Sequence, residues 1–315
     1  MFTIEQVGAF VPDTSCTVQD LRDPLGLTDN EVLVYTRFLG LNRVAIAPEV
    51  SLDEMLRRAG ESALRGVDRG RVRFLIHAHT MQHAAPPSQH MLEQVRDDLG
   101  LDRASVLGIS HQNCVIGLHA LQVARFLLAG SADEDDKALI VTGDKILSRS
   151  IHLIPDTTIM GEAAAAAVIG RDPRGDRILG RAIRVLGRFY QSMACPEKLT
   201  AEYKQIYADT FGEVLAAALE NAHCDPAEVA AIIPHNVNRL SWKKVAAALG
   251  IPFDRVYLDN IPRTGHCFAS DPLINLDCAR TAGRVRPGDV VLMASAGLGA
   301  TFGAAVVRIG TGVPR

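Results

Sequence analysis

The sequence lacks several features that would place it in a specialised class of protein. Its six cysteines form no Cys-x-x-Cys pair and are too sparse for a disulfide framework, so we expect reduced thiols. No apolar run approaches the roughly 18 residues that a membrane span needs, and no basic, apolar leader opens the chain. A net charge of −3 gives no general attraction to nucleic acid or anionic membranes. These absences predict a soluble, cytoplasmic protein.

The composition that is present is typical of a protein with a large buried core. Hydrophobic residues make up 48% of the 315 residues and charged residues 22%. Apolar runs of strand length alternate with longer amphipathic stretches, which predicts an α/β fold with a buried sheet. The turn-forming, charged segment that begins at Arg171 predicts a boundary between an N-terminal half, residues 1–170, and a C-terminal half, residues 171–315.

The two halves repeat the same order of elements. Each has a strand, a helix that ends in Leu-Gly, an Asp-Arg pair, a short strand, and then a candidate reactive residue before another helix. The interval from the arginine to that residue is the same, 114 − 103 = 11 for Cys114 and 266 − 255 = 11 for His266. If the halves are copies that pack about a pseudo-twofold axis, Cys114 and His266 face each other.

Cys114 is the candidate nucleophile. A short strand gives way at once to an apolar helix at this point, so the thiol lies at or next to the helix N-terminus. Unpaired N–H groups and the helix dipole favour a thiolate there. The alternative is a small buried hydrophobic residue, which describes most free cysteines.

His235 and His266 each follow a predicted strand, and the repeat places both near Cys114. A thiol with two imidazoles suits covalent acyl catalysis, although each histidine alone is also compatible with a structural role. Asp271 stands five residues after His266 and before a proline. Its carboxylate either orients His266 or caps the following helix.

Further candidates are weaker. Glycines surround Leu298 in the C-terminal segment, so its backbone N–H, together with that of Cys114, could hold an oxyanion; a plain hairpin turn is the alternative. Arg239 and Trp242 open a helix after His235 and could meet coenzyme A or a carrier protein, or simply pack or face solvent. His77, His79 and His83 have no cysteine or carboxylate cluster beside them, so we expect no metal site.

Several segments together resemble the thiolase superfamily, and within it ketoacyl-ACP synthase III. They are the region that ends in Cys114, ALIVTGDKILSR, GEAAAAAVIG, IIPHNVN, TGHCFASDP and the C-terminal glycine-rich segment, in the family's order. The resemblance runs nearly end to end. It implies a duplicated five-layer αβαβα fold, a homodimer, an acyl-cysteine intermediate, and acyl groups carried on coenzyme A or an acyl carrier protein, with no bound cofactor.

The sequence differs from the family pattern at His266, where the elongating members of the family have asparagine, and at Leu298, where a further glycine is usual. His266 followed by Asp271 resembles a Cys-His-Asp branch of acyltransferases found in antibiotic pathways. We therefore expect an acyltransferase that passes an acyl group from Cys114 to a hydroxyl, amine or thiol. The first alternative is a decarboxylative Claisen-condensing synthase, because related elongating synthases use a Cys-His-His set for that reaction. The second is a non-catalytic partner subunit of such a synthase.

Overall fold

The chain forms layers of helices around a large mixed sheet in a computed structural model that describes residues 2–81 and 90–312. Among these residues the sheet has nine strands in the order β11-β12-β13-β10-β1-β9-β6-β4-β5. The strands are β1 (Thr3–Phe10), β4 (Val72–Ala78), β5 (Ser105–Ile109), β6 (Lys137–Gly143), β9 (Ala164–Gly170), β10 (Asp176–Val185), β11 (Val229–Pro234), β12 (Val290–Gly297) and β13 (Thr301–Arg308). Most of them are buried, as near-continuous apolar runs require.

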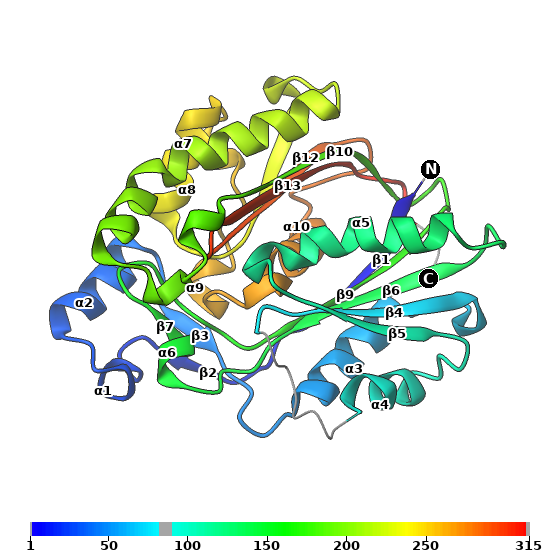
Figure 1. The fold of residues 1–315 in the computed structure, drawn as a ribbon, viewed down its shortest axis with the longest axis horizontal. Helices are drawn as coiled ribbons and strands as arrows, with labels where there is room; N and C mark the ends of the chain where they lie inside the picture. Colours follow the sequence, from blue (N-terminus) through cyan, green and yellow to red (C-terminus); the bar gives the residue numbers. More distant parts are fainter. Residues whose placement is uncertain (1, 82–89, 313–315) are drawn as a thin grey trace.

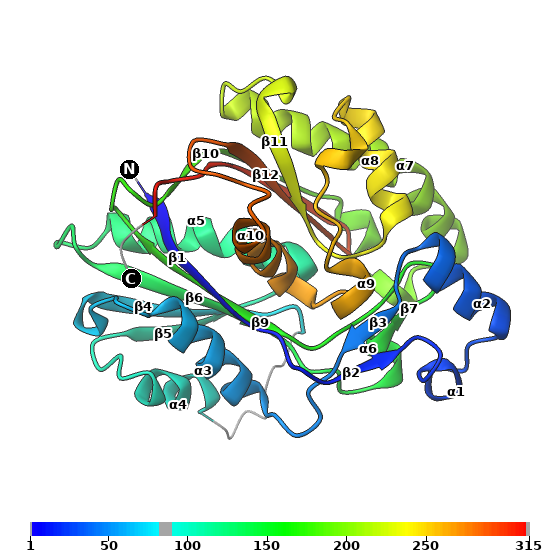
Figure 2. The same ribbon diagram turned by 180° about the vertical axis from the view of Figure 1, so that it is seen from behind.

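Helices cover this sheet in three layers (Figures 1 and 2). The central layer holds α5 (Ile116–Ala129) and α10 (Asp271–Thr281), which lie between the two arms of the sheet. The outer layers hold α7 (Glu197–Asn221) with α8 (Arg239–Leu249), and α3 (Leu52–Ala63) with α4 (Met91–Asp98). The predicted α/β fold with thiolase-like layering is therefore confirmed, with one refinement: the two arms are joined into a single sheet because β1 pairs with β10.

Both arms have the same pattern of strand pairing. In the first, β4 is parallel to β6, β6 is antiparallel to β9, and β9 is antiparallel to β1. In the second, β11 is parallel to β12, β12 is antiparallel to β13, and β13 is antiparallel to β10. This repetition agrees with the equal spacing found in the sequence. The predicted boundary after residue 170 falls between β9 and β10, and the division into two separate units stays a prediction.

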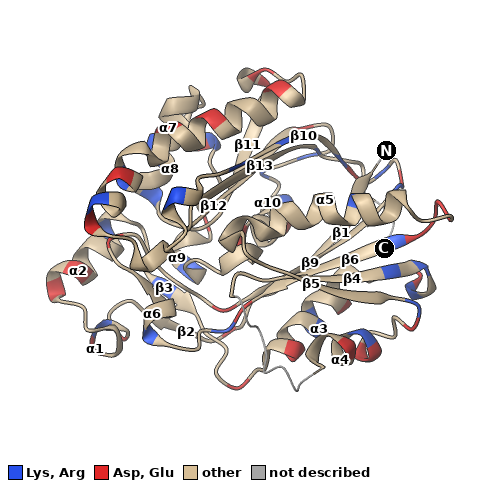
Figure 3. Ribbon diagram, in the orientation of Figure 1, with Lys and Arg blue, Asp and Glu red and all other residues tan. Residues whose placement is uncertain are grey.

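Short elements pack at one side of these layers, next to the rim of the large sheet (Figure 1). They are β2 (Ser15–Thr17), α1 (Arg22–Leu25), α2 (Asp29–Leu33), β3 (Arg43–Ala45), α6 (Arg149–His152), β7 (Leu153–Ile154), β8 (Thr158–Ile159) and α9 (Ile261–Thr264). Lys, Arg, Asp and Glu lie mainly on the outer helices and the loops (Figure 3). Throughout residues 2–81 and 90–312, no helix combines the length and apolar character that crossing a bilayer requires.

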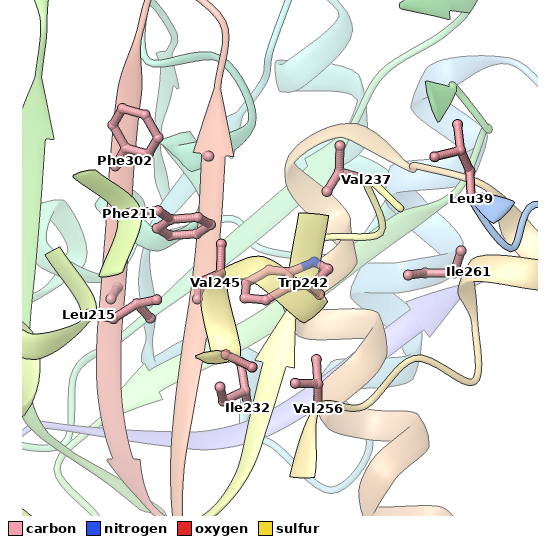
Figure 4. Close-up of a cluster of buried hydrophobic side chains, with 14 of the residues drawn as sticks. Leu39, Phe211, Leu215, Ile232, Val237, Trp242, Val245, Val256, Ile261 and Phe302 are labelled. Carbon is pink, nitrogen blue, oxygen red and sulfur yellow. The ribbon is translucent and has the colours of Figure 1, made fainter. Parts of the chain in front are cut away.

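Three aromatic side chains, Phe211, Trp242 and Phe302, lie in the buried cluster that Figure 4 shows. Phe211 on α7 lies 5.3 Å from Trp242 on α8 and 5.6 Å from Phe302 on β13, between ring centroids. Helix α8 is fixed at both ends: the Asn238 side chain accepts from the Ser241 N–H at 2.8 Å, and Gly250 ends the helix with a left-handed φ of 71°. This cluster packs against His235, whose ring centroid is 6.0 Å from that of Phe211.

Candidate active site

A pocket of about 780 Å³ opens where the two halves meet. Cys114 comes to it from the first half, and His235, His266 and Leu298 come from the second. Much of the remaining wall is apolar, with methionine, valine, isoleucine and tyrosine side chains among its lining. The arrangement that the internal repeat predicts, a sulfur and an imidazole at a shared centre, is therefore present.

Cys114 lies in a 3₁₀ turn, Asn113–Val115, that leads directly into α5. The side chain is 7% exposed, and its Sγ is 3.1 Å from Nε2 of His266. On the opposite side, Oγ of Ser295 donates to the Cys114 carbonyl oxygen at 2.8 Å. The sulfur is thus fixed at the beginning of the central helix within hydrogen-bonding distance of an imidazole.

His266 is held between that sulfur and a buried carboxylate. Its Nδ1 is 2.5 Å from Oδ2 of Asp271, and its backbone N–H donates to the Ile159 carbonyl oxygen at 3.1 Å. Asp271 is fully buried and is the first residue of α10, whose N-cap is Ser270. Of the two interpretations of Asp271, the contact with His266 is the one present in the structure.

The pKa of His266 reflects opposing effects. Burial alone lowers it, but the negative charges of Cys114 and Asp271, together with the hydrogen bonds to both, outweigh burial and raise the pKa to about 10. The imidazole is therefore protonated at neutral pH, with Asp271 as its counter-ion.

His235 has the opposite electrostatic character. Burial, followed by the nearby charge of His266, lowers the pKa of His235 well below its usual value, so the ring is neutral. The ring centroids of the two histidines are 5.4 Å apart, and Nδ1 of His235 has no hydrogen-bond partner among the described residues. The pocket thus offers one charged and one neutral imidazole side by side.

Sequence reasoning missed the amides that hold Asp271. The backbone N–H of Asn236 donates to Oδ2 at 2.6 Å and its side chain donates to Oδ1 at 3.1 Å, while the Cys267 N–H donates at 2.9 Å. Asn275 on α10 in turn donates to the Asn236 side chain at 2.8 Å. A signal was available, because Asn236 directly follows His235 and Asn275 interrupts an apolar helix face.

The glycine-rich hairpin approaches Cys114 closely. A Cβ atom at Gly297 would lie 2.7 Å from the Asn113 Cβ and 3.0 Å from the Cys114 backbone nitrogen, so this position has no room for a side chain. The Asn113 side chain donates to the Leu298 carbonyl oxygen. Neither the Cys114 nor the Leu298 backbone N–H donates to another residue within the described ranges.

Two weaker candidates do not reach the pocket. Trp242 is 1% exposed and its Nε1 donates to the His235 carbonyl oxygen at 2.8 Å, so its ring packs in the core and is not presented to coenzyme A or a carrier protein. Arg239 is exposed, and its guanidinium lies over the Phe253 ring at 5.7 Å. Ser241 and Lys244, farther along α8, line the pocket instead.

Two of the three histidines considered for a metal, His77 and His79, do not line the pocket. Nε2 of His77 is 3.1 Å from the Gly143 carbonyl oxygen, and the His77 and His79 ring centroids are 4.7 Å apart. The third, His83, lies outside the described residues. The expectation of no metal site stays a prediction.

Comparison with known proteins identifies relatives along almost the whole chain. The chain is 28% identical to β-ketoacyl-[acyl-carrier-protein] synthase III of Thioalkalivibrio sulfidiphilus, covering 97% of this chain and 98% of that protein. It is also 28% identical to the enzyme of that name from Pectobacterium atrosepticum, covering 96% and 97%. Residues 219–309 match the family model for the C-terminal part of 3-oxoacyl-[acyl-carrier-protein] synthase III.

Solved structures share the fold. The 3-oxoacyl-[acyl-carrier-protein] synthase III of Aquifex aeolicus superimposes with a TM-score of 0.81 at 24% identity, covering 98% of this chain and 100% of that one. ChlB3, described as an acyltransferase, superimposes with a TM-score of 0.86 at 21% identity, covering 99% and 98%. At such identities the likeness concerns the fold alone.

These relatives correct one expectation from the sequence. The main expectation was transfer of an unchanged acyl group from Cys114 to a hydroxyl, amine or thiol, based on the pairing of His266 with Asp271. The curated relatives matched along nearly their full length are instead named β-ketoacyl synthases, so the acyl-transfer expectation is wrong and the condensing alternative is better supported. The contact of His266 with Asp271 determines the protonation state of the imidazole. It does not determine which molecule accepts the acyl group.

The named relatives, the family model and the shared fold all agree with the resemblance found in the sequence. The resemblance to ketoacyl-ACP synthase III of the thiolase superfamily, first indicated by the spacing of a few sequence segments, is confirmed along nearly the whole chain.

Proposed function

We propose that this protein catalyses the decarboxylative Claisen condensation of an acyl group, held as a thioester on Cys114, with a malonyl-type thioester. One observation carries the proposal: Sγ of Cys114 lies 3.1 Å from Nε2 of His266, with neutral His235 beside them in one partly apolar pocket. A nucleophilic sulfur with two imidazoles supplies both covalent catalysis and stabilisation of an enolate.

In the first step the sulfur of Cys114 attacks the carbonyl carbon of an acyl thioester. The new C–S bond forms, the bond to the carrier sulfur breaks, and the departing thiolate takes a proton from His266. The free N–H groups of Cys114 and Leu298 are the candidate donors to the negatively charged oxygen. The apolar wall of the pocket suits a hydrocarbon acyl group.

Before the second step His266 regains a proton from solvent, which replaces the one given to the departing thiolate, so one proton is consumed per turnover. In the second step the malonyl group loses its free carboxylate as carbon dioxide. The electron pair of the broken C–C bond forms an enolate, and His235 and His266, which both line the pocket, are the candidates to stabilise its oxygen. The enolate carbon then attacks the acyl carbonyl, the C–S bond to Cys114 breaks, and the thiolate is restored. Asp271 takes part through His266, whose positive charge it stabilises, and is thus a positioning residue.

The acyl groups reach the site on coenzyme A or on an acyl carrier protein. Lys204 and Lys244 line the pocket, and both are exposed. Cationic groups at an entrance attract phosphates and acidic carrier surfaces. The names of the relatives include the acyl carrier protein, which supports the same class of partner.

We also propose that two copies associate through β5, which gives a homodimer. This strand ends one side of the nine-stranded sheet and is only half-buried. The opposite end is protected, because Ile232 on β11 makes a further bridge to Val256. An exposed strand edge offers unpaired backbone groups to a second strand.

Mass spectrometry with labelled substrates tests the proposed reaction. Incubation with an acyl-CoA should add the mass of the acyl group to wild-type protein but not to Cys114→Ala. Subsequent addition of malonyl thioester should release carbon dioxide and yield a β-ketoacyl thioester.

Two results would contradict the proposal. Transfer of an intact malonyl group without carbon dioxide would exclude condensation. Failure to form any adduct at Cys114, together with iodoacetamide reactivity no higher than that of Cys16, would favour the non-catalytic alternative. Cys16→Ala is the matched control, because it removes a partly buried thiol outside the pocket.

A further inference from the structure

A second cavity, of about 400 Å³, lies between α5 and strands β10 and β13. Its apolar wall comes mainly from leucine and isoleucine side chains of α5 and β10. Its polar lining consists of Gln122 and Arg125 on α5 and Arg181 on β10. The cavity shares no lining residue with the pocket around Cys114, so it is a separate site. Its size is at the lower end of the range for small-molecule pockets.

Arg181 is half-buried and Arg125 is exposed, and no acidic side chain in the described ranges pairs with either guanidinium group. Neither guanidinium forms an ion pair or a hydrogen bond with any residue in the described ranges. Burial and then the charge of Arg125 lower the pKa of Arg181, and the charge of Arg181 contributes, after burial, to lowering the pKa of His119. No acidic side chain lines the cavity. An anion would relieve the repulsion between these groups.

Gln122 provides a second, independent indication of a ligand. The residue is 5% exposed, its side-chain amide makes no hydrogen bond with a described residue, and its polar atoms are not among the fully buried unpaired ones, so the amide is accessible from the cavity. Buried amides normally have partners, because an unsatisfied donor or acceptor costs free energy. Gln122 lines the same cavity as the two arginines.

We propose that the cavity binds a small carboxylate with a short hydrocarbon chain. A carboxylate accepts hydrogen bonds from guanidinium N–H groups in a paired geometry and from the amide of Gln122 as well. The leucine and isoleucine side chains then contact the hydrocarbon part. This site is independent of the condensation reaction, because no residue of the active-site pocket takes part.

Calorimetric titration with octanoate tests the proposal, with uncharged octanol as the comparison. We expect saturable binding of octanoate, at least tenfold weaker in Arg181→Ala and in Gln122→Leu, and weak binding of octanol. Arg65→Ala is the matched control, because Arg65 is exposed and lies outside the cavity. Equal dissociation constants in wild type and both variants, or equal binding of octanol, would overturn the proposal.

Two further outcomes distinguish a ligand cavity from the active site and from an interface between copies. Octanoate that acetyl-CoA displaces, and that Arg181→Ala binds normally, lies in the active site, which would also overturn the proposal. The proposal would also be overturned if octanoate does not bind and Arg181→Ala halves the molecular mass in solution. The arginines would then lie at an interface between two copies. Loss of condensation activity with intact octanoate binding would leave this site standing and contradict only the proposed reaction.

Discussion

Three side chains in a row set the chemistry of the pocket. Asp271 contacts His266, and His266 contacts Cys114, at 2.5 Å and 3.1 Å respectively. Because all three side chains are buried, the protonation state of His266 depends on its two neighbours and not on solvent. A charged imidazole can stabilise an enolate oxygen in a way that a neutral amide cannot. In the proposed condensation the carboxylate would therefore act through the proton on His266.

Asp271→Asn should shift the pH dependence of condensation. Loss of the negative charge lowers the pKa of His266, by about 1–3 units for a close opposite charge. The imidazole then loses its proton at lower pH, so the alkaline limb of the kcat profile should move to lower pH. Steady-state rates between pH 6 and 10 measure this, with exposed Glu134→Gln as the control. An unchanged alkaline limb in a correctly folded variant would mean that Asp271 does not control His266.

Asp144 is a second buried carboxylate, and it positions part of the pocket wall. Its side chain is 1% exposed and accepts hydrogen bonds from the backbone N–H groups of Thr80 and Met81 at 3.0–3.1 Å. Both of these residues line the pocket. Burial raises the pKa of Asp144 to about 7, although the hydrogen bonds act in the opposite direction.

Stability should therefore depend on pH through Asp144. Since the folded pKa is above the unfolded value, the folded state binds the extra proton between about pH 4 and pH 7, and the free energy of unfolding falls as pH rises through this window. The slope contributed is at most about 1.4 kcal/mol per pH unit. Asp144→Asn should remove it. Urea unfolding of both proteins at pH 5 and pH 8 measures the difference, and parallel pH dependences would contradict the assignment.

At the scale of elements, the hairpin from β12 to β13 places Leu298 next to Cys114. Gly297 permits this approach, because any side chain there would meet the backbone nitrogen of the nucleophile. Gly297→Ala should push the hairpin away and weaken an oxyanion donor, with a loss of about 10²–10³ in kcat for one donor. Gly130→Ala is the control, because its Cβ would make only an ordinary contact of 3.5 Å at a negative φ. Rates that differ less than threefold between the two variants would show that the hairpin does not contribute.

The sequence could predict the elements that repeat, but not the contacts between them. Equal spacing from Arg103 to Cys114 and from Arg255 to His266 indicated that the two residues meet, and the structure places them 3.1 Å apart. Trp242 was ambiguous, because an aromatic residue at a helix start can pack in the core or contact a ligand, and only its contacts with Phe211 and His235 decide between the two. The contact of Asn236 with Asp271 joins residues 35 positions apart and leaves no periodic signal, so the position of Asn236 directly after His235 was the one indication of it.

At the scale of the whole molecule, the choice of reaction could not be read from local pattern. Cysteine, histidine and aspartate at the observed distances suit acyl transfer and condensation alike, and the acyl acceptor is determined by what else enters the pocket. The full-length relatives favoured condensation. Dimer formation could not be predicted from local pattern either. That β5 is a half-buried strand at the edge of the sheet is known only once all the strands have been placed.

The last prediction concerns this edge of the sheet. If two copies pair through β5, light scattering should give a molecular mass of 2 × 34.0 = 68.0 kDa. Alternate residues of an edge strand direct their N–H groups outward, so of Val106→Pro and Leu107→Pro one removes an outward donor and the other weakens the pairing of β5 with β4. The variant that removes an outward donor should reduce the mass toward 34.0 kDa with little change in thermal unfolding. The variant that weakens the pairing with β4 should lower the unfolding temperature. A wild-type mass of 34.0 kDa at micromolar concentration would show that β5 remains unpaired in solution.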